Sequence, residues 1–184
     1  MIILALDIST HTGWAVFNDE KLLDYGVLNI KVDDLNFKPD PSKSPKYPKN
    51  ILNASSGMLY LIKGLLDKYS PEVVVCENTQ KGRNRHYQRC LEWFHKDIID
   101  YFVDHEQAFV YMDPSEWRSI LNMRLSNEDK KNNREVSLGK KRGRITKKHL
   151  SVRWVNSTYN LNLKIKDNDI ADAISLGTSY FKGK

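Results

Sequence analysis

Short apolar runs along this chain alternate with longer stretches in which apolar residues recur every three to four positions. The short runs cover residues 2–6, 12–17, 22–30, 73–76 and 108–112. Their length and their β-branched or alternating composition predict five strands. The first three follow one another closely in sequence, so an antiparallel meander is the simplest arrangement for them.

Helical periodicity fills most of the remaining chain. Residues 51–69, 83–105 and 169–181 predict helices, residues 146–159 predict another with a threonine as its N-cap, and residues 113–118 indicate a turn entering a short helix. The helix before the fourth strand supplies the crossover that parallel pairing requires. The order βββαβαβα therefore predicts an α/β fold, with a mixed five-stranded sheet flanked by helices.

Two stretches show no period. Residues 32–50 contain four prolines and predict a long loop. Residues 126–145 are polar, basic and contain glycine, and we expect them to form a basic flexible loop when no nucleic acid is bound. Residues 1–184 together fit a single domain with one core.

Four carboxylates stand where such a fold would gather them. Asp7 ends the first strand, Glu77 ends the fourth, and Asp169 and Asp172 lie three positions apart near the C-terminus. The C-terminal ends of parallel strands share one edge, and helix residues three apart share one face. Any one of these acids alone is explained equally well as a turn or cap residue. Together they predict a cation site, and oxygen ligands without a Cys or His cluster suit Mg²⁺ or Mn²⁺.

Positive charge is concentrated in one part of the chain. The net charge is +6, and residues 124–153 contain eleven Lys or Arg against three acids, which leaves about −2 for the remainder. A basic segment on a nearly neutral body predicts a polyanion partner, with nucleic acid as the first candidate. No apolar run approaches the ~20 residues of a membrane span, and the N-terminal run is too short for a signal peptide. Because the only cysteines are Cys76 and Cys90, we expect a cytoplasmic protein, from a bacterium or an infected cell.

Four motifs carry a resemblance to a known family. They are residues 4–15 (LALDISTHTGWA), 74–77 (VVCE), 113–118 (DPSEWR) and 169–173 (DIADA). With the order of elements, they resemble the RNase H-like nuclease fold and, within it, the RuvC family of Holliday-junction resolvases, especially its phage branch. The first and last motifs are the specific ones. Bacterial members usually have Pro-Gly after the first aspartate, whereas Ile8-Ser9 stands here and changes the turn beside it.

The resemblance implies a divalent-metal-dependent endodeoxyribonuclease of the crossover-junction type. Such an enzyme resolves four-way junctions and other branched DNA by paired nicks, in DNA recombination and repair, and acts as a homodimer. Its catalytic and metal-binding residues would be Asp7, Glu77, Asp169 and Asp172. Two Mg²⁺ ions per site, with Mn²⁺ as the alternative, would bind with Asp7 between them. Asp167 is expected to point away, and neither a nucleotide cofactor nor a membrane is expected.

Nine residues are candidates for DNA contacts: Arg83, Arg85, Tyr87, Lys140, Lys141, Arg142, Arg144, Lys147 and Lys148. The first three belong to a basic, aromatic segment after Glu77, in which Tyr87 could stack on an unpaired base. An ordinary basic helix start is the competing explanation. The others fall where the family keeps DNA-binding lysines, and Lys147 and Lys148 match best. His11 is a candidate phosphate neighbour, while the other histidines and the tryptophans are interpreted as structural.

Other functions remain open from the sequence. A flap or fork nuclease of the same fold fits the same residues. A phosphotransferase of the actin and sugar-kinase type shares the pattern of residues 7–13, but it needs a second domain that 184 residues cannot hold. A junction-binding protein without activity would not need four acids. For the dimer we expect a contact along residues 83–105, through a stripe of Tyr87, Cys90, Trp93, Asp97 and Tyr101.

Overall fold

A mixed five-stranded sheet forms the centre of the computed structural model, which describes residues 1–30, 48–79 and 85–183. The strand order is β3-β2-β1-β4-β5, with the bounds Ile2–Asp7 (β1), His11–Asn18 (β2), Lys21–Asn29 (β3), Val73–Glu77 (β4) and Phe109–Met112 (β5). The first three strands form an antiparallel meander, and β1, β4 and β5 run parallel. The predicted strands and the mixed sheet are therefore confirmed.

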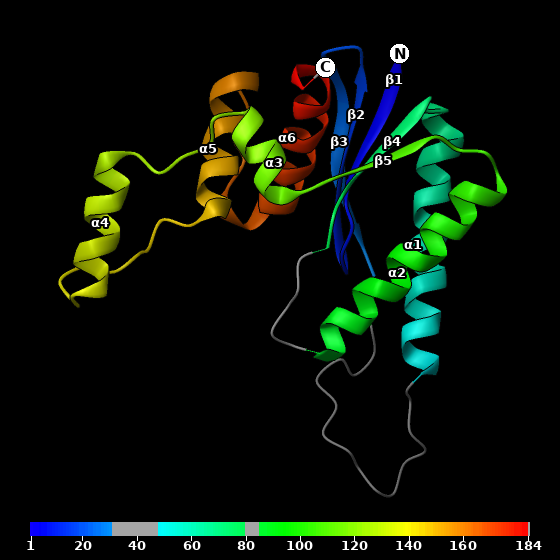
Figure 1. Ribbon diagram of the computed structural model, residues 1–184, viewed down its shortest axis with the longest axis horizontal. Helices are drawn as coiled ribbons and strands as arrows, with labels where there is room; N and C mark the ends of the chain where they lie inside the picture. The colour runs from blue at the N-terminus through cyan, green and yellow to red at the C-terminus, as the bar shows by residue number, and fades with distance from the viewer. Residues whose placement is uncertain (31–47, 80–84, 184) are drawn as a thin grey trace, which may run out of the picture.

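Helices cover both faces of this sheet (Figure 1). One face carries α1 (Lys49–Tyr69) and α2 (Arg85–Asp104), and the other carries α3 (Pro114–Ile120), α5 (Lys147–Tyr159) and α6 (Asn168–Lys182), with a 3-10 turn η1 (Ile165–Asp167) leading into α6. The long loop predicted for residues 32–50 falls mostly on residues 31–47, outside the described residues. Within the described ranges, no helix combines the length and the apolar character needed to span a membrane.

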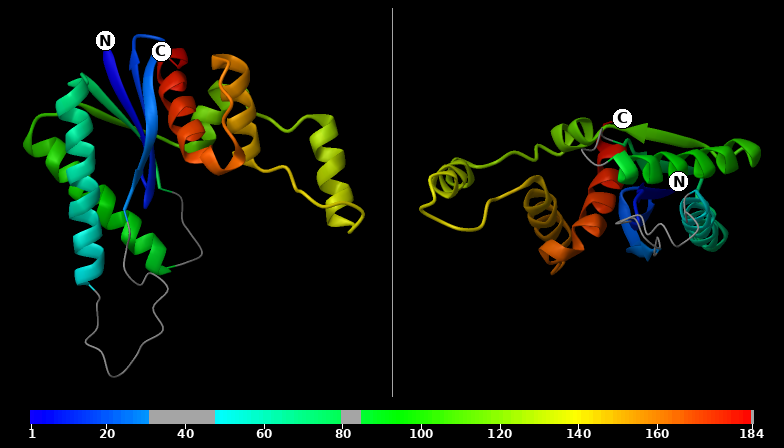
Figure 2. Two further views of the ribbon diagram at one scale, coloured as in Figure 1. Left: turned by 180° about the vertical axis from the view of Figure 1, so that it is seen from behind. Right: turned by 90° about the horizontal axis from the view of Figure 1, so that it is seen from below.

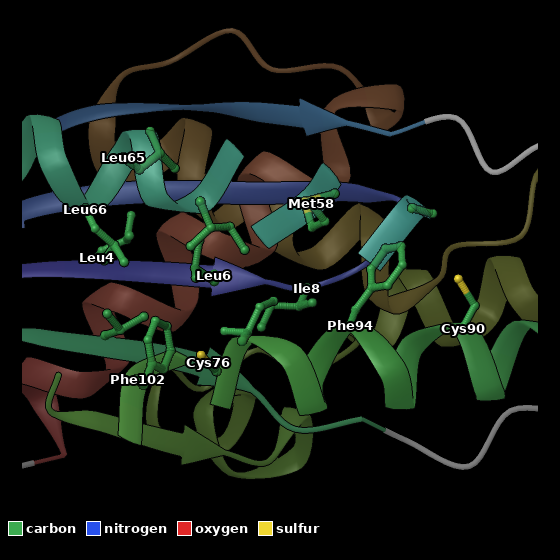
Figure 3. Close-up of a cluster of buried hydrophobic side chains, with 14 of the residues drawn as sticks. Leu4, Leu6, Ile8, Met58, Leu65, Leu66, Cys76, Cys90, Phe94 and Phe102 are labelled. Carbon is green, nitrogen blue, oxygen red and sulfur yellow. The ribbon is translucent and has the colours of Figure 1, made fainter. Parts of the chain in front are cut away.

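Alternate side chains of β1 enter two different cores. Leu4 and Leu6 are buried on the side of α1 and α2 (Figure 3), whereas Ile3 and Ala5 are buried on the side of α5 and α6. Successive side chains of a strand point to opposite faces of its sheet. Asp7 continues the alternation of Ile3 and Ala5, so its side chain is directed to the face that α6 covers.

Two glycines allow α6 to lie close against the sheet. A Cβ built on Gly13 of β2 would lie 1.9 Å from the carbonyl oxygen of Asp169, and one on Gly177 of α6 would lie 2.3 Å from the ring of Phe17. Both distances are far inside van der Waals contact, so a side chain at either position would push helix and strand apart. Gly13 thereby determines how closely the first turn of α6 approaches the sheet.

The prediction of a flexible loop over residues 126–145 is wrong for its first half. The chain there forms α4 (Asn127–Ser137), which stands to one side of the molecule on two arms (Figures 1 and 2). A capping box starts the helix, because Asp129 N–H donates to Ser126 Oγ at 3.0 Å and Ser126 N–H donates to Asp129 Oδ2 at 3.2 Å. Asp129 also pairs with Arg153 of α5 at 2.8 Å. Apolar periodicity misses α4 because polar caps, and no apolar face, stabilise it.

Most of the stripe proposed for a dimer contact on α2 lies beside α1 and is partly covered by it. Cys90 is fully buried, and Tyr101 packs against the same core. Ser55 of α1 donates hydrogen bonds to Asp97 Oδ2 at 2.6 Å and to the Trp93 carbonyl at 3.1 Å. The expectation is therefore wrong for Cys90, whereas Trp93, Asp97 and Tyr101 are half-buried beside α1 and their part in a dimer contact stays a prediction.

Candidate active site

The ends of β1 and β4 bring the first two acids together. The two strands are parallel neighbours, and Leu6 lies opposite Cys76 in their register. The next residue on each strand is an acid, Asp7 on β1 and Glu77 on β4. By the alternation of strand side chains, both acids are directed to the face that α6 covers.

The first turns of α6 supply the other two acids. Asp169 and Asp172 lie three residues apart on this helix, and together with Asp7 and Glu77 they line one pocket of about 260 Å³. The rest of its lining comes from Ile8, Ser9, Asn78, Thr79, Tyr87, Leu91, His95, Lys148 and Asn168. The structure thus brings together all four acids that the sequence singled out.

Burial and mutual repulsion make these acids hard to ionise. Burial raises the pKa of Asp7 well above its ordinary value, and the charges of Glu77, Asp172 and Asp169 raise it further. Burial, followed by the charge of Asp172, raises the pKa of Glu77 to about 7. Burial also raises the pKa of Asp172, which is only 7% exposed. Such a cluster carries its full negative charge only when cations compensate it.

Helix α3 places an aromatic ring and a cation beside the acids. Trp117 is fully buried, and its Nε1–H donates to Glu77 Oε2 at 2.9 Å. Arg118 lies over the Trp117 ring, 4.1 Å from its centre, and its Nη2 is 3.7 Å from Asp172 Oδ2. The Arg118 side chain is 13% exposed, so α3 orients one acid and sets a permanent positive charge beside another.

A second cation reaches the pocket from the start of α5. Thr146 is the N-cap of this helix, as predicted, and Lys148 follows in its first turn. Lys148 Nζ donates to Asn168 Oδ1 at 3.3 Å, and Asn168 Nδ2 donates to the Asp169 carboxylate. Of the two lysines that the sequence favoured, Lys148 lines the pocket, while Lys147 is exposed and its charge acts on Glu77.

The donor chemistry of the pocket fits a hard divalent cation. Four carboxylates offer oxygen ligands, and Asp172 Oδ1 is buried without a hydrogen-bond partner among the described residues. In the same part of the chain, however, no group of three or more His, Cys, Asp or Glu side chains is arranged to hold an ion. The four carboxylates therefore line one pocket without the close arrangement of a metal site, and a bound ion would have to draw them together against their repulsion.

The other predicted contact residues lie at the pocket or on the arm that returns from α4. Tyr87 lines the pocket, and Arg85 is exposed at the start of α2. Four residues are exposed on the returning arm, namely Lys140, Lys141, Arg142 and Arg144. Arg83 lies outside the described residues. His11 is exposed and is not among the residues that line the pocket.

Three contributors to the pocket escape sequence reasoning. The sequence indicates only a packing role for Trp117, although this residue belongs to the motif of residues 113–118. Asn168 precedes an acid and carries no signal of its own. From the sequence, His95 is interpreted as a structural histidine. It follows Tyr87 by eight residues and Leu91 by four, and this spacing places all three on one side of α2. Asp167 points to its own turn, as expected, and accepts from Lys164 N–H at 2.9 Å.

Comparison with known proteins gives a match at the level of structure alone. No protein-family model and no curated protein matches the sequence. Thermus thermophilus RuvC in complex with a Holliday junction substrate is similar over 99% of this chain and 94% of its own, with a TM-score of 0.65 and 14% identity. A further T. thermophilus RuvC structure covers 99% and 94%, with a TM-score of 0.58 and 15% identity. The yeast mitochondrial Holliday junction resolvase Ydc2 covers 98% and 77%, with a TM-score of 0.56 and 15% identity.

These similarities extend over nearly the whole described architecture. They show that the chain has the RNase H-like fold found in the RuvC resolvases, as the sequence motifs indicated. At sequence identities of 14–15%, the structural similarity establishes the fold alone, and the assignment to the phage branch stays a prediction. The function therefore rests on the chemistry of the pocket.

Proposed function

We propose that this protein is a divalent-metal-dependent endodeoxyribonuclease that resolves Holliday junctions and other branched DNA by paired nicks. The observation that carries the proposal is that Asp7, Glu77, Asp169 and Asp172 line one pocket of a RuvC-like fold. T. thermophilus RuvC, which shares this fold, is described in complex with a Holliday junction substrate. The basic residues between 124 and 153 supply the phosphate-binding surface that such a substrate needs.

The four acids would hold the metal in this proposal. Two Mg²⁺ ions, with Mn²⁺ as the alternative, would activate a water molecule and neutralise the charge that develops on the phosphate. Asp7 interacts electrostatically with each of the other three acids, which makes it the natural shared ligand. Glu77 and Asp172 flank it from β4 and α6, and Asp169 completes the set.

The chain's own cations would position the phosphodiester. Arg118 is held by Trp117 and by the Pro114 carbonyl, to which its Nη1 donates at 3.1 Å, so its charge stays beside Asp172. Lys148 is exposed and is bonded to the Asn168 amide, a neutral partner that a phosphate oxygen could replace. The hydrogen bond from Trp117 keeps Glu77 turned toward the pocket.

Paired nicks on one junction require two active sites. A homodimer with one isologous interface supplies them, and we keep this assembly as part of the proposal. Cys90, which is buried between α2 and α1, is not available to such an interface. A cytoplasmic location and the absence of a nucleotide cofactor also stay predictions.

A cleavage panel with Mg²⁺ on four-way, three-way, flap and linear DNA tests the proposal. The parent protein should cut the four-way junction fastest, with symmetric nicks. Asp7→Asn should reduce cleavage to background and keep junction affinity, because it removes a metal ligand and leaves the basic surface intact. Asp100→Asn is the matched control, since Asp100 is an exposed acid on α2 paired with Lys96.

Two outcomes would contradict the proposal. If Asp7→Asn cuts at the parent rate, the assignment of the site is wrong. If the parent prefers a flap and leaves four-way junctions intact, the protein is a flap or fork nuclease of the same fold.

A further inference from the structure

Helix α2 lines one side of the pocket, and it contributes His95, which has no role in the proposed metal binding. Tyr87, Leu91 and His95 line the pocket at successive intervals of four residues. His95 is the deepest of the three and is only 7% exposed. Its Nε2 is buried and has no hydrogen-bond partner within the described part of the chain. Buried polar atoms are rarely left unpaired, and each exception calls for an explanation.

The other ring nitrogen of His95 is held from the sheet. Nδ1 lies 2.7 Å from the hydroxyl of Tyr111 on β5, and the two ring centres are 5.6 Å apart. Burial lowers the pKa of His95 to about 4, so the imidazole is neutral at physiological pH. Burial also raises the pKa of Tyr111, so the phenol keeps its proton. The pair is therefore a neutral imidazole joined to a neutral phenol.

The hydroxyl decides which nitrogen of His95 carries hydrogen. A neutral imidazole has one N–H and one bare nitrogen, and the half-buried phenol of Tyr111 has one proton to donate. Among the described residues, His95 Nδ1 is the hydrogen-bond partner that the Tyr111 hydroxyl has. We infer that the Tyr111 hydroxyl donates to Nδ1, which leaves the hydrogen of the neutral ring on Nε2. The ring lines the pocket, and the N–H group at its buried Nε2, on the side of the ring away from the Tyr111 hydroxyl, has no acceptor within the described part of the chain.

We propose that His95 donates a hydrogen bond from Nε2 to a phosphate oxygen of the DNA strand bound in the pocket. This inference rests on the proposed function, which places a phosphodiester beside the four acids. The pocket already gathers four acids, and a bound phosphate adds further negative charge. A neutral donor with a fixed direction binds that oxygen without competing with the metal for the carboxylates. Tyr111 is the positioning residue, because it fixes the tautomer and the orientation of the ring.

The tautomer can be measured without any cleavage. Long-range ¹H–¹⁵N correlation spectra of the uniformly ¹⁵N-labelled, metal-free protein at neutral pH distinguish the two neutral forms of each histidine. His95 should show the form protonated at Nε2, and Tyr111→Phe should give a mixture of both forms. His105, which is exposed at the end of α2, is the internal reference in the same spectrum. A parent His95 protonated at Nδ1, or on both nitrogens, would overturn the inference.

Single-turnover cleavage of a four-way junction tests the contact itself. His95→Asn keeps an amide near Nδ1 and removes the donor at Nε2, and it should slow cleavage at saturating enzyme by about 10–100-fold. His95→Gln places its amide near Nε2 and should recover part of this loss. Junction affinity should change little in both, because most of the binding energy comes from the basic surface. Unfolding curves identify the folded fraction, and His105→Asn should cut like the parent.

The outcomes separate this inference from the proposed function. A parent protein that cuts no branched DNA would overturn both. A parent that cuts, with a folded His95→Asn that cuts equally fast, would overturn only the role of His95. Equal losses in His95→Asn and His95→Gln, in proportion to their unfolded fractions, would show that the residue supports the fold and not the substrate.

Discussion

Replacing Glu77 by Gln should stabilise the metal-free protein, and increasingly so as the pH rises from about 4.5 to 7. Burial and the charge of Asp172 raise the pKa of Glu77 from its ordinary 4.5 to about 7. The folded state therefore binds this proton more tightly than the unfolded state does. The stability that the protonated carboxyl contributes is fully present below pH 4.5 and is lost as the pH rises through 7. Glutamine is neutral at every pH and avoids this loss.

The magnitude follows from the two pKa values. The difference between 4.5 and about 7 corresponds to about 3 kcal/mol in the free energy of unfolding. For a chain of this length that is about 6–12 °C in the unfolding temperature. Removing the charge of Glu77 also lowers the pKa of Asp7, since Glu77 is the largest charge acting on Asp7, and this adds to the effect in the same direction.

The assay is thermal or urea unfolding in EDTA across this pH range, with the parent and Glu77→Gln compared at each pH. The comparison is needed because His95, whose pKa burial lowers to about 4, makes the stability of both proteins rise between pH 4 and 6.5. Glu135→Gln is the control, since the pair with Lys141 lowers the pKa of that half-exposed acid and the sign should reverse. A stability difference between parent and Glu77→Gln that does not change with pH would refute the reasoning.

Mg²⁺ should reverse the pattern in the parent. Ions bind the ionised carboxylates, so the stabilisation by Mg²⁺ should grow with pH and reach about 2.7 kcal/mol at a concentration 100-fold above the dissociation constant. Glu77→Gln should gain less, because one ligand is missing. A parent protein whose stability ignores Mg²⁺ at pH 7.5 would contradict the metal site itself.

Three further predictions concern the DNA surface, α6 and assembly. Neutralising the four basic residues of the arm that returns from α4 (Lys140, Lys141, Arg142 and Arg144) should flatten the salt dependence of junction binding, by about 0.9 in log–log slope per lost phosphate contact. Neutralising Lys21 and Lys68, at the opposite end of the sheet, should leave the slope unchanged. An unchanged slope in the first variant would place the DNA elsewhere. Gly13→Ala should destabilise the fold by about 1–3 kcal/mol and slow cleavage, because its Cβ would meet the Asp169 carbonyl at 1.9 Å, while Gly64→Ala, with nothing within 4 Å, should not destabilise it in the same unfolding and cleavage assays. Sedimentation at micromolar concentration should give about twice 21.4 kDa, and a monomer both free and on a junction would argue against paired nicks.

The local pattern of residues was sufficient for much of the fold. The strand runs, the caps such as Thr146 and the acids that follow β1 and β4 depend on periodicities of a few residues, which the sequence displays directly. The gathering of Asp7, Glu77, Asp169 and Asp172 was also predictable, because parallel strands end at one edge and helix residues three apart share a face. These rules act within one element or between neighbours of known direction.

Other features required the tertiary structure. Helix α4 has no apolar face that the sequence could display. The side of α2 that was expected to face a partner chain packs against α1, and only the packing of distant segments shows this contact. The bond from Trp117 to Glu77 joins residues 40 positions apart, and the bond between His95 and Tyr111 joins a helix to a strand. Such contacts depend on the angle and depth at which whole elements meet. One residue's type and spacing do not contain that information, so the sequence by itself determined which acids could form a site, and the assembled fold determined which neutral and cationic side chains serve them.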